Sequence, residues 1–139
     1  MAQARSIAEV RALLDTNVLV RHLTGDPPGQ ARRATALLRA RHELILTDLV
    51  LAEMVYVLES FYERPRTEIS EMTRALLALP SIAVVDHDLL LRAVELYEDA
   101  RLDFAEAYLA ALVELSDVNQ VASFDRQIDR VKTIKRVEP

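Results

Sequence analysis

The chain lacks cysteine and tryptophan and has only two glycines among its 139 residues. Without cysteine it can form no disulfide, no thiolate zinc site and no cysteine nucleophile, so oxygen atoms remain as metal ligands. Few glycines together with a hydrophobic share of 51% are typical of a mostly helical chain with a real core. Its length fits a single domain over residues 1–139.

Long apolar runs are also lacking, and none approaches the roughly 20 residues that span a bilayer. Residues 1–6 have no apolar core of the kind that a signal peptide carries. We therefore expect a cytoplasmic protein that does not contact a membrane. The formal net charge of −5, from 22 acidic and 17 basic residues, argues against nonspecific nucleic-acid binding through a global basic field. Any such binding must be local.

Strand-like and helix-like patterns alternate along the chain. Apolar runs predict strands over residues 10–14, 44–46, 82–85, 121–123 and 133–134. Spacing and capping residues predict helices over residues 18–23, 30–41, 48–62, 67–79, 89–100 and 103–115. Thr47, Thr67 and Asp86 are the expected helix caps. Such alternation indicates an α/β fold with a parallel sheet, in which ligands bind beyond the carboxyl ends of the strands.

Acidic side chains stand at informative places in this pattern. Glu53 is the lone charged residue in the apolar run over residues 49–58. An unpaired buried charge costs several kcal/mol, so Glu53 must reach solvent, a partner or a cation. Asp15 and Asp125 each follow a predicted strand, and we expect both at the same edge of one parallel sheet. Asp103 and Glu106 share one face near the start of a predicted helix.

Several acids without matching bases indicate a metal site. A carboxylate cluster without histidine suits magnesium, and His22, His42 and His87 are scattered and receive no catalytic role. Simpler readings remain open for each acid. Glu53 alone reads as a helix-surface residue, whereas Asp15, Asp103 and Asp125 read as helix caps or turn residues.

The ordered set of motifs resembles that of PIN-domain nucleases, especially the VapC-type toxins of prokaryotic toxin–antitoxin pairs. Residues 13–21, Leu-Leu-Asp-Thr-Asn-Val-Leu-Val-Arg, are similar to the opening motif of that family. Thr47 with Glu53 resembles the second motif, residues 102–111 the third and residues 123–126 the fourth. The resemblance implies a three-layer α/β/α PIN-like fold with a short, mainly parallel central sheet. It also implies an endoribonuclease dependent on Mg²⁺, or alternatively Mn²⁺, that forms a homodimer and is inhibited by a cognate antitoxin.

By position, the resemblance implies that Asp15, Glu53 and Glu106 are the core catalytic and metal-binding acids and that Asp125 is the more variable fourth. The family usually has aspartate at the position of Glu106, and the longer side chain could weaken metal binding. Asp103 is an alternative metal ligand, and which of Asp103 and Glu106 is the principal one stays open. Two further polar residues, Asn17 and Ser123, are candidate supports for the ligands, whereas Thr16 is expected to be structural only.

Other residues leave alternatives open. Arg21 and Arg126 lie beside proposed ligands, where contact with phosphate and a salt bridge to the acids are equally open. The apolar helix around Tyr56 and Phe61 indicates a surface for an antitoxin or for self-association. The alternatives to a toxin are a PIN-domain nuclease of RNA processing and a catalytically weak interaction domain that retains the fold. An aspartate-nucleophile phosphatase fits poorly, because Asn17 stands where such enzymes carry a second acid.

Overall fold

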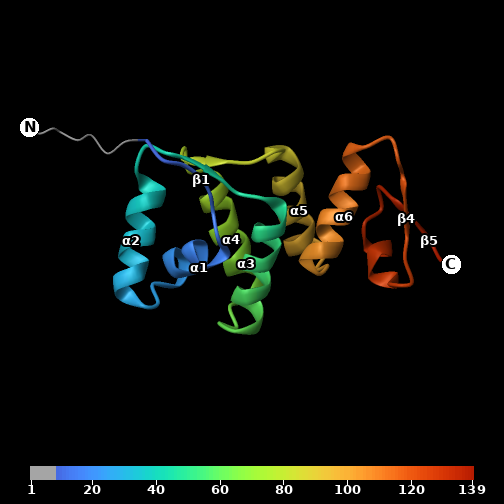
Figure 1. Cartoon of the computed structure of the whole chain (residues 1–139). Helices are drawn as coiled ribbons and strands as arrows, with labels where there is room; N and C mark the ends of the chain where they lie inside the picture. The colour runs from blue at the N-terminus through green and yellow to red at the C-terminus, as the bar shows by residue number, and fades with distance from the viewer. Residues whose placement is uncertain (1–8) are drawn as a thin grey trace, which may run out of the picture. The chain divides into compact units, whose positions relative to one another are not determined.

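The computed structural model describes residues 9–139, so residues 1–6, which carry the prediction about a signal peptide, lie outside the described part. The described chain is α/β, as predicted (Figure 1). Its helices are α1 (Thr16–Thr24), α2 (Pro28–Arg39), α3 (Asp48–Ser60), α4 (Arg66–Leu77), α5 (His87–Asp99), α6 (Phe104–Leu115) and the 3₁₀ helix η1 (Arg126–Arg130). Its strands are β1 (Arg11–Leu13), β2 (Glu43–Ile45), β3 (Ile82–Ala83), β4 (Gln120–Ala122) and β5 (Lys135–Val137). None of the helices within residues 9–139 is long and apolar enough to cross a membrane.

The chain divides into two compact units whose segments are interleaved in sequence. The first unit contains the described residues up to Met54 together with Ala75–Val85. The second contains Val55–Arg74 and Asp86–Pro139. The expectation of a single domain over residues 1–139 stays a prediction.

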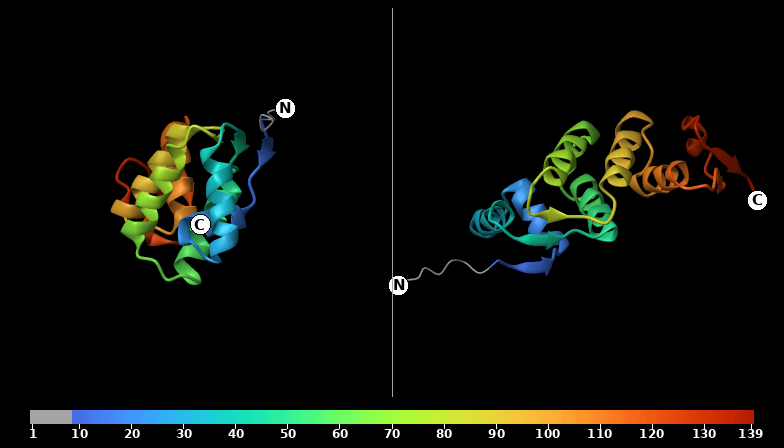
Figure 2. Two further views of the ribbon diagram at one scale, coloured as in Figure 1. Left: turned by 90° about the vertical axis from the view of Figure 1, so that its left-hand side faces the viewer. Right: turned by 90° about the horizontal axis from the view of Figure 1, so that it is seen from above.

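The first unit contains a parallel sheet in the order β1-β2-β3 (Figure 2). Leu13 lies opposite Ile45, and Ile45 lies opposite Ala83. The backbone pairing continues past the strand ends, where the Leu14 N–H donates to the Ile45 carbonyl at 2.9 Å. Because the strands are parallel, the segments that leave β1 and β2 start at the same edge of this sheet. One leads through Asp15 into α1 and the other through Thr47 into α3.

Helices α1 and α2 lie side by side in the first unit, as Figure 1 shows. Helix α1 is short and is closed at both ends. Asp15 is its N-cap, and Gly25 ends it with φ of 75° while its N–H donates to the Arg21 carbonyl at 2.8 Å. Only glycine adopts that left-handed conformation without a steric penalty. Leu19 of α1 and Leu38 of α2 are buried with the β2 residue Leu44 in the apolar core of this unit.

Helices α5 and α6 pack against each other in the second unit. Helix α5 begins at Asp86, whose carboxylate accepts a hydrogen bond from the Leu89 N–H at 3.0 Å, so this predicted cap is confirmed. The rings of Tyr97 on α5 and Phe104 on α6 lie edge to face with centroids 5.9 Å apart. Strands β4 and β5 form a separate parallel pair in this unit.

Arg66, the first residue of α4, connects segments of the second unit that are distant in sequence. Its guanidinium Nη1 donates to the carbonyl of Tyr97 at 2.7 Å and to that of Leu102 at 2.5 Å. The guanidinium carbon also lies 4.2 Å from the centroid of the Tyr97 ring, which is a cation–π contact. The connection between α5 and α6 is therefore bound to α4 by one side chain.

Some sequence-based expectations are wrong. Strand β4 is hydrogen-bonded to β5 and not to β1, so Asp15 and Asp125 do not follow strands of one sheet. The last strand is Lys135–Val137 rather than residues 133–134, because the Ile134 N–H bonds back to the Val131 carbonyl and closes a turn.

Most helix bounds differ by one or two residues from expectation; the starts of α4 and α2 have a clear physical reason, and the predicted cap of α3 is confirmed. Helix α4 begins at Arg66 because the Pro65 carbonyl accepts its first helical bond, and Thr67 therefore lies within the helix and does not cap it. Helix α2 begins at Pro28 and not at residue 30, since proline is favourable in the first turn of a helix. Thr47 does cap α3, with its hydroxyl oxygen accepting from the Val50 N–H at 3.2 Å.

The two glycines provide a matched test of the α1 C-cap. We expect Gly25→Ala to lower the free energy of unfolding by about 1 kcal/mol, because alanine must adopt a left-handed φ. Gly29→Ala on α2 is the control, and it should be neutral or stabilising by up to about 1 kcal/mol, since alanine favours helix. Its added Cβ would meet only the tips of Arg32 and Arg33, at 4.0 Å. Urea denaturation measures both values, and an equal loss in both variants would contradict the role of Gly25.

Candidate metal centre

Asp15 is placed by the junction of β1 and α1. Leu14, next to the strand, is buried and fixes the end of β1, and the chain then turns into α1. The Asp15 carboxylate oxygen Oδ1 accepts a hydrogen bond from the Thr16 N–H at 2.9 Å. Asp15 is thus the predicted helix cap, and its side chain is exposed. A carboxylate that caps with one oxygen keeps lone pairs for a cation.

Thr16 links Asp15 to the second acid of the first unit. Its side chain is buried, and its hydroxyl donates a hydrogen bond of 2.5 Å to the Glu53 oxygen Oε1. Residue 16 therefore orients a predicted ligand 37 positions further along the chain. The sequence predicts only a structural role for Thr16, because nothing local shows which side chain its hydroxyl meets.

Glu53 occupies the exposed side of an otherwise apolar helix. Its α3 neighbours Leu51 and Met54 are fully buried, whereas Glu53 itself is exposed and is bound to Thr16. The sequence left solvent, a partner or a cation as the ways to satisfy this charge. The structure shows the first two, and a carboxylate held at one oxygen retains the other for a cation.

Asp103 and Glu106 lie at the start of α6 in the second unit. Asp103 is at the N-cap position, yet its exposed side chain makes no capping hydrogen bond. Glu106, three residues later, accepts a hydrogen bond from the backbone of Asp103, as the third residue of a capping box does. The Glu106 oxygen Oε1 is nevertheless buried and has no hydrogen-bond partner within residues 9–139.

Asp125 precedes η1 in the same unit and meets Glu106. Its Oδ1 accepts from the Gln127 N–H at 2.9 Å, and its carboxyl group also lies within hydrogen-bonding reach of the Glu106 carboxyl. Within the described residues, Ser123 makes no hydrogen bond to a carboxylate, and its expected support of a metal ligand stays a prediction. Its hydroxyl oxygen accepts from the Asp125 N–H at 2.9 Å, so Ser123 supports the backbone that carries Asp125.

Two carboxyl groups this close cannot both be ionised without cost. Burial, together with hydrogen bonding to Asp125 and the charge of Asp125, raises the pKa of Glu106 from 4.5 to about 7. The hydrogen bond that Glu106 donates when it is protonated lowers the pKa of Asp125. Glu106 therefore keeps its proton to a higher pH than an isolated glutamate, whereas Asp125 stays ionised to a lower pH than usual.

The second unit has features that fit a hard divalent cation. A cation can replace the proton that one of two crowded carboxyl groups retains, because it offsets their negative charge. The buried Oε1 of Glu106, which receives no hydrogen bond within the described residues, could then act as a ligand. Glu106 and Asp125, with the nearby Asp103, would hold the ion here, and Asp15 and Glu53 offer the same ligand type in the first unit. Within the described residues, no three His, Asp or Glu side chains are already arranged as a metal site.

Asn17 and Arg21 form no hydrogen bond or ion pair with Asp15 or Glu53 within residues 9–139. Both side chains lie on α1 and line a cavity with residues of α2, and neither has a hydrogen bond or an ion pair within residues 9–139. The expected support of Asp15 by Asn17 stays a prediction. Arg126 is exposed at the start of η1. Of the two alternatives for Arg21, a salt bridge to an acid is not seen within residues 9–139.

Comparison with protein-family models gives a match over most of the chain. The family model described as PIN domain matches residues 12–134, which include all five predicted acids. The search of curated proteins finds no significant match. The match supports the resemblance to PIN-domain nucleases that the ordered motifs indicate. It does not show whether the chain belongs to the VapC-type subfamily.

The contact between Thr16 and Glu53 is testable by isosteric substitution. We expect Thr16→Val to lower the free energy of unfolding in chelator by about 1 kcal/mol, because a hydrogen bond to a charged group is lost. Mn²⁺ affinity should fall about 10-fold or more, as for other residues that orient a metal ligand. Thr16→Ser keeps the hydroxyl and is the control. Unchanged Mn²⁺ affinity in Thr16→Val, measured by calorimetry, would rule out an orienting role.

The carboxyl pair predicts a pH dependence in the metal-free protein. Glu106 has a raised pKa, so its contribution to stability is complete at low pH and is lost as the pH rises through about 7. Glu106→Gln should remove this loss. In Asp125→Asn the pKa of Glu106 should fall, yet stay above 4.5 because burial persists. Carbon-13 NMR of the carboxyl groups and urea midpoints across pH measure both effects. A Glu106 pKa near 4.5 in the native protein would contradict the pairing.

Proposed function

The chain belongs to the PIN domain family, a family of nucleases, and from this premise we propose that it is a divalent-metal-dependent endoribonuclease. The observation that carries the proposal is the Glu106–Asp125 pair, which crowds two carboxyl groups and leaves a buried oxygen unpartnered. Such an arrangement costs stability in an ordinary structural role, whereas a cation satisfies it.

In the proposed reaction, Asp15 and Glu53 of the first unit and Glu106 and Asp125 of the second would be the ligands of Mg²⁺ or Mn²⁺, and Asp103 is a further candidate ligand. A bound divalent cation lowers the pKa of water and offsets the negative charge of a phosphodiester. Thr16 orients Glu53 through its 2.5 Å hydrogen bond, and Ser123 supports the backbone of Asp125. Water attacks the RNA phosphate in line, the opposite P–O ester bond breaks, and the leaving ribose oxygen takes up a proton while the attacking water loses one to solvent, so no covalent protein nucleophile takes part. The described side chains include no cysteine, and Asn17 removes the second acid of a phosphoaspartate site.

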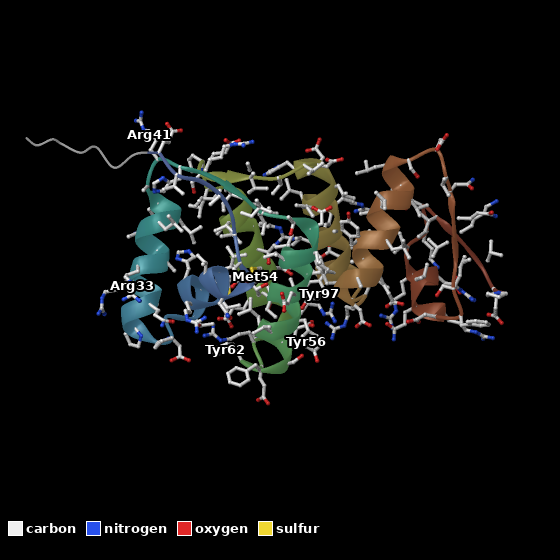
Figure 3. All side chains as sticks on the ribbon, viewed as in Figure 1. Arg33, Arg41, Met54, Tyr56, Tyr62 and Tyr97 are labelled. Atoms are coloured by element: carbon white, nitrogen blue, oxygen red, sulfur yellow. The ribbon has the colours of Figure 1, made fainter. Side chains whose placement is uncertain are left out.

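We also propose that the protein is the toxin of a toxin–antitoxin pair and forms a homodimer. Support comes from apolar side chains left exposed in the second unit. Tyr56 on α3 is 66% exposed and Phe61 just after it is 75% exposed (Tyr56 is labelled in Figure 3). A cognate antitoxin should then inhibit cleavage. A nuclease of RNA processing and a catalytically weak interaction domain are the alternatives, the latter because Glu106 replaces the usual aspartate.

Cleavage of a mixed panel of RNAs tests the proposed activity. We expect cuts with Mg²⁺ or Mn²⁺, none with chelator, and more than about 100-fold slower cutting by Asp15→Asn, since loss of a ligand exceeds the loss of a residue that orients one. Asp117→Asn removes the same charge from an exposed position after α6 and should cleave normally. Cuts that survive in Asp15→Asn would contradict the assigned site. No cutting by the native protein with either metal would favour the interaction domain.

The unusual glutamate has a test of its own. We expect Glu106→Asp to cleave at least as fast as the native protein, because the shorter side chain restores the residue that the family usually has. The measurement is the cleavage rate as a function of Mn²⁺ concentration, which separates metal affinity from the maximal rate. Loss of activity in Glu106→Asp, with an unchanged melting temperature, would show that this site is built around glutamate.

A further inference from the structure

A cavity of about 440 Å³ lies in the first unit, lined by both α1 and α2. Polar side chains from the two helices line it, with Asn17 and Arg21 on α1 and Gln30 and Arg33 on α2. Figure 1 shows the two helices side by side, and Figure 3 labels Arg33 on α2. The remaining lining residues are small or apolar: Val18, Ala34 and Leu37.

The polar side chains of this cavity have no hydrogen-bond acceptors among residues 9–139. None of the four side chains has a hydrogen bond or an ion pair within the described chain. The Arg21 Nε is buried and unpartnered. Leaving a buried donor of a charged group unpaired costs at least about 1–3 kcal/mol, so an acceptor from outside the protein would be stabilising. Other arginines of the chain, such as Arg92 and Arg136, are paired with carboxylates.

The charges at the cavity select an anion. Two guanidinium groups line it and no carboxylate does, although the chain carries a net charge of −5. Gln30 stands in the first turn of α2, which has no acidic residue in that turn and no side-chain cap on its N-terminus. The positive end of the helix dipole therefore adds to the two fixed charges. Guanidinium groups match the oxygen geometry of a phosphate better than they match a spherical anion.

We infer that this cavity binds a backbone phosphate of the RNA substrate, held by Arg21 and Arg33. The inference rests on the proposed ribonuclease function. Asp15 caps the same helix that carries Asn17 and Arg21, so a strand bound in the cavity is fixed with respect to this acid. The contact reads the backbone and not the bases, so it supplies affinity and register without sequence specificity.

RNA binding in the presence of chelator tests the cavity apart from cleavage. The probe is a short, fluorescein-labelled single-stranded RNA of mixed sequence, titrated by anisotropy at roughly 50 to 200 mM salt. We expect Arg33→Gln to weaken binding about 10-fold and to lower the salt slope by about 0.7, as the loss of one phosphate contact does on a single strand. Arg32→Gln is the matched control, because Arg32 is the adjacent exposed arginine on α2 and does not line this cavity. It should change the affinity less than about 2-fold and leave the salt slope unchanged.

Arg21 is tested separately because its Nε is buried. The Nε–Hε resonance of Arg21 should shift on addition of the RNA in the native protein, and Arg21→Lys, which keeps the charge but loses the fork, should weaken binding about 5-fold or more. Melting temperatures confirm that each variant is folded. A shift caused by inorganic phosphate but not by RNA would assign the cavity to a free anion and overturn the inference.

The remaining outcomes are also decisive. Equal losses of RNA affinity in Arg33→Gln and Arg32→Gln would mean that RNA binds to a diffuse basic surface and would overturn the inference. Absence of RNA binding by the native protein would also overturn it. Binding of a glutamate-rich peptide in place of RNA would point to a carboxylate-bearing protein partner. If RNA binds in chelator and depends on Arg33 while no metal supports cleavage, the cavity assignment stands and the proposed nuclease function fails.

Discussion

Repulsion between carboxylates is the constraint around which the second unit is arranged. Glu106 lies in the first turn of α6 and Asp125 is the N-cap of η1, and their proximity raises the pKa of Glu106 and lowers that of Asp125. Each carboxyl also has a local structural task, since Glu106 accepts from the backbone of Asp103 and Asp125 caps η1. These backbone hydrogen bonds partly offset the free-energy cost of bringing the two carboxyl groups together. The Glu106 Oε1, which has no hydrogen-bond partner within residues 9–139, is the atom at which a cation would be most stabilising.

The first unit solves a milder form of the same problem. Asp15 and Glu53 are exposed, so water screens their charges, and the Thr16 hydroxyl between their elements fixes one of them by a short hydrogen bond. Both units therefore use capping positions as the places where acids project. A helix start needs an acceptor for its free N–H groups, and the same residue keeps a second oxygen for chemistry.

Local signals explain what the sequence could predict. The α/β class, the cap at Asp86 and the placement of Asp15 at a helix start each depend on residues within a few positions of one another. Predictions failed where a contact depends on two residues that are far apart in the sequence. The hydroxyl of Thr16 meets a residue 37 positions away, and β4 pairs with β5 and not with β1. The sequence also could not predict that the Arg21 Nε has no hydrogen-bond partner within the described residues, because the partners of an arginine depend on residues distant in the sequence.

The start of α6, the helix that carries Glu106, depends on Arg66 of α4. Its guanidinium binds the carbonyl of Leu102, the residue just before Asp103, and also the Tyr97 carbonyl and ring. The residue before α6 is therefore held by a side chain from α4 that carries no carboxylate. A substitution at residue 66 would remove this support at the start of α6 without changing Asp103 or Glu106, a dependence that inspection of the acidic motifs alone does not reveal.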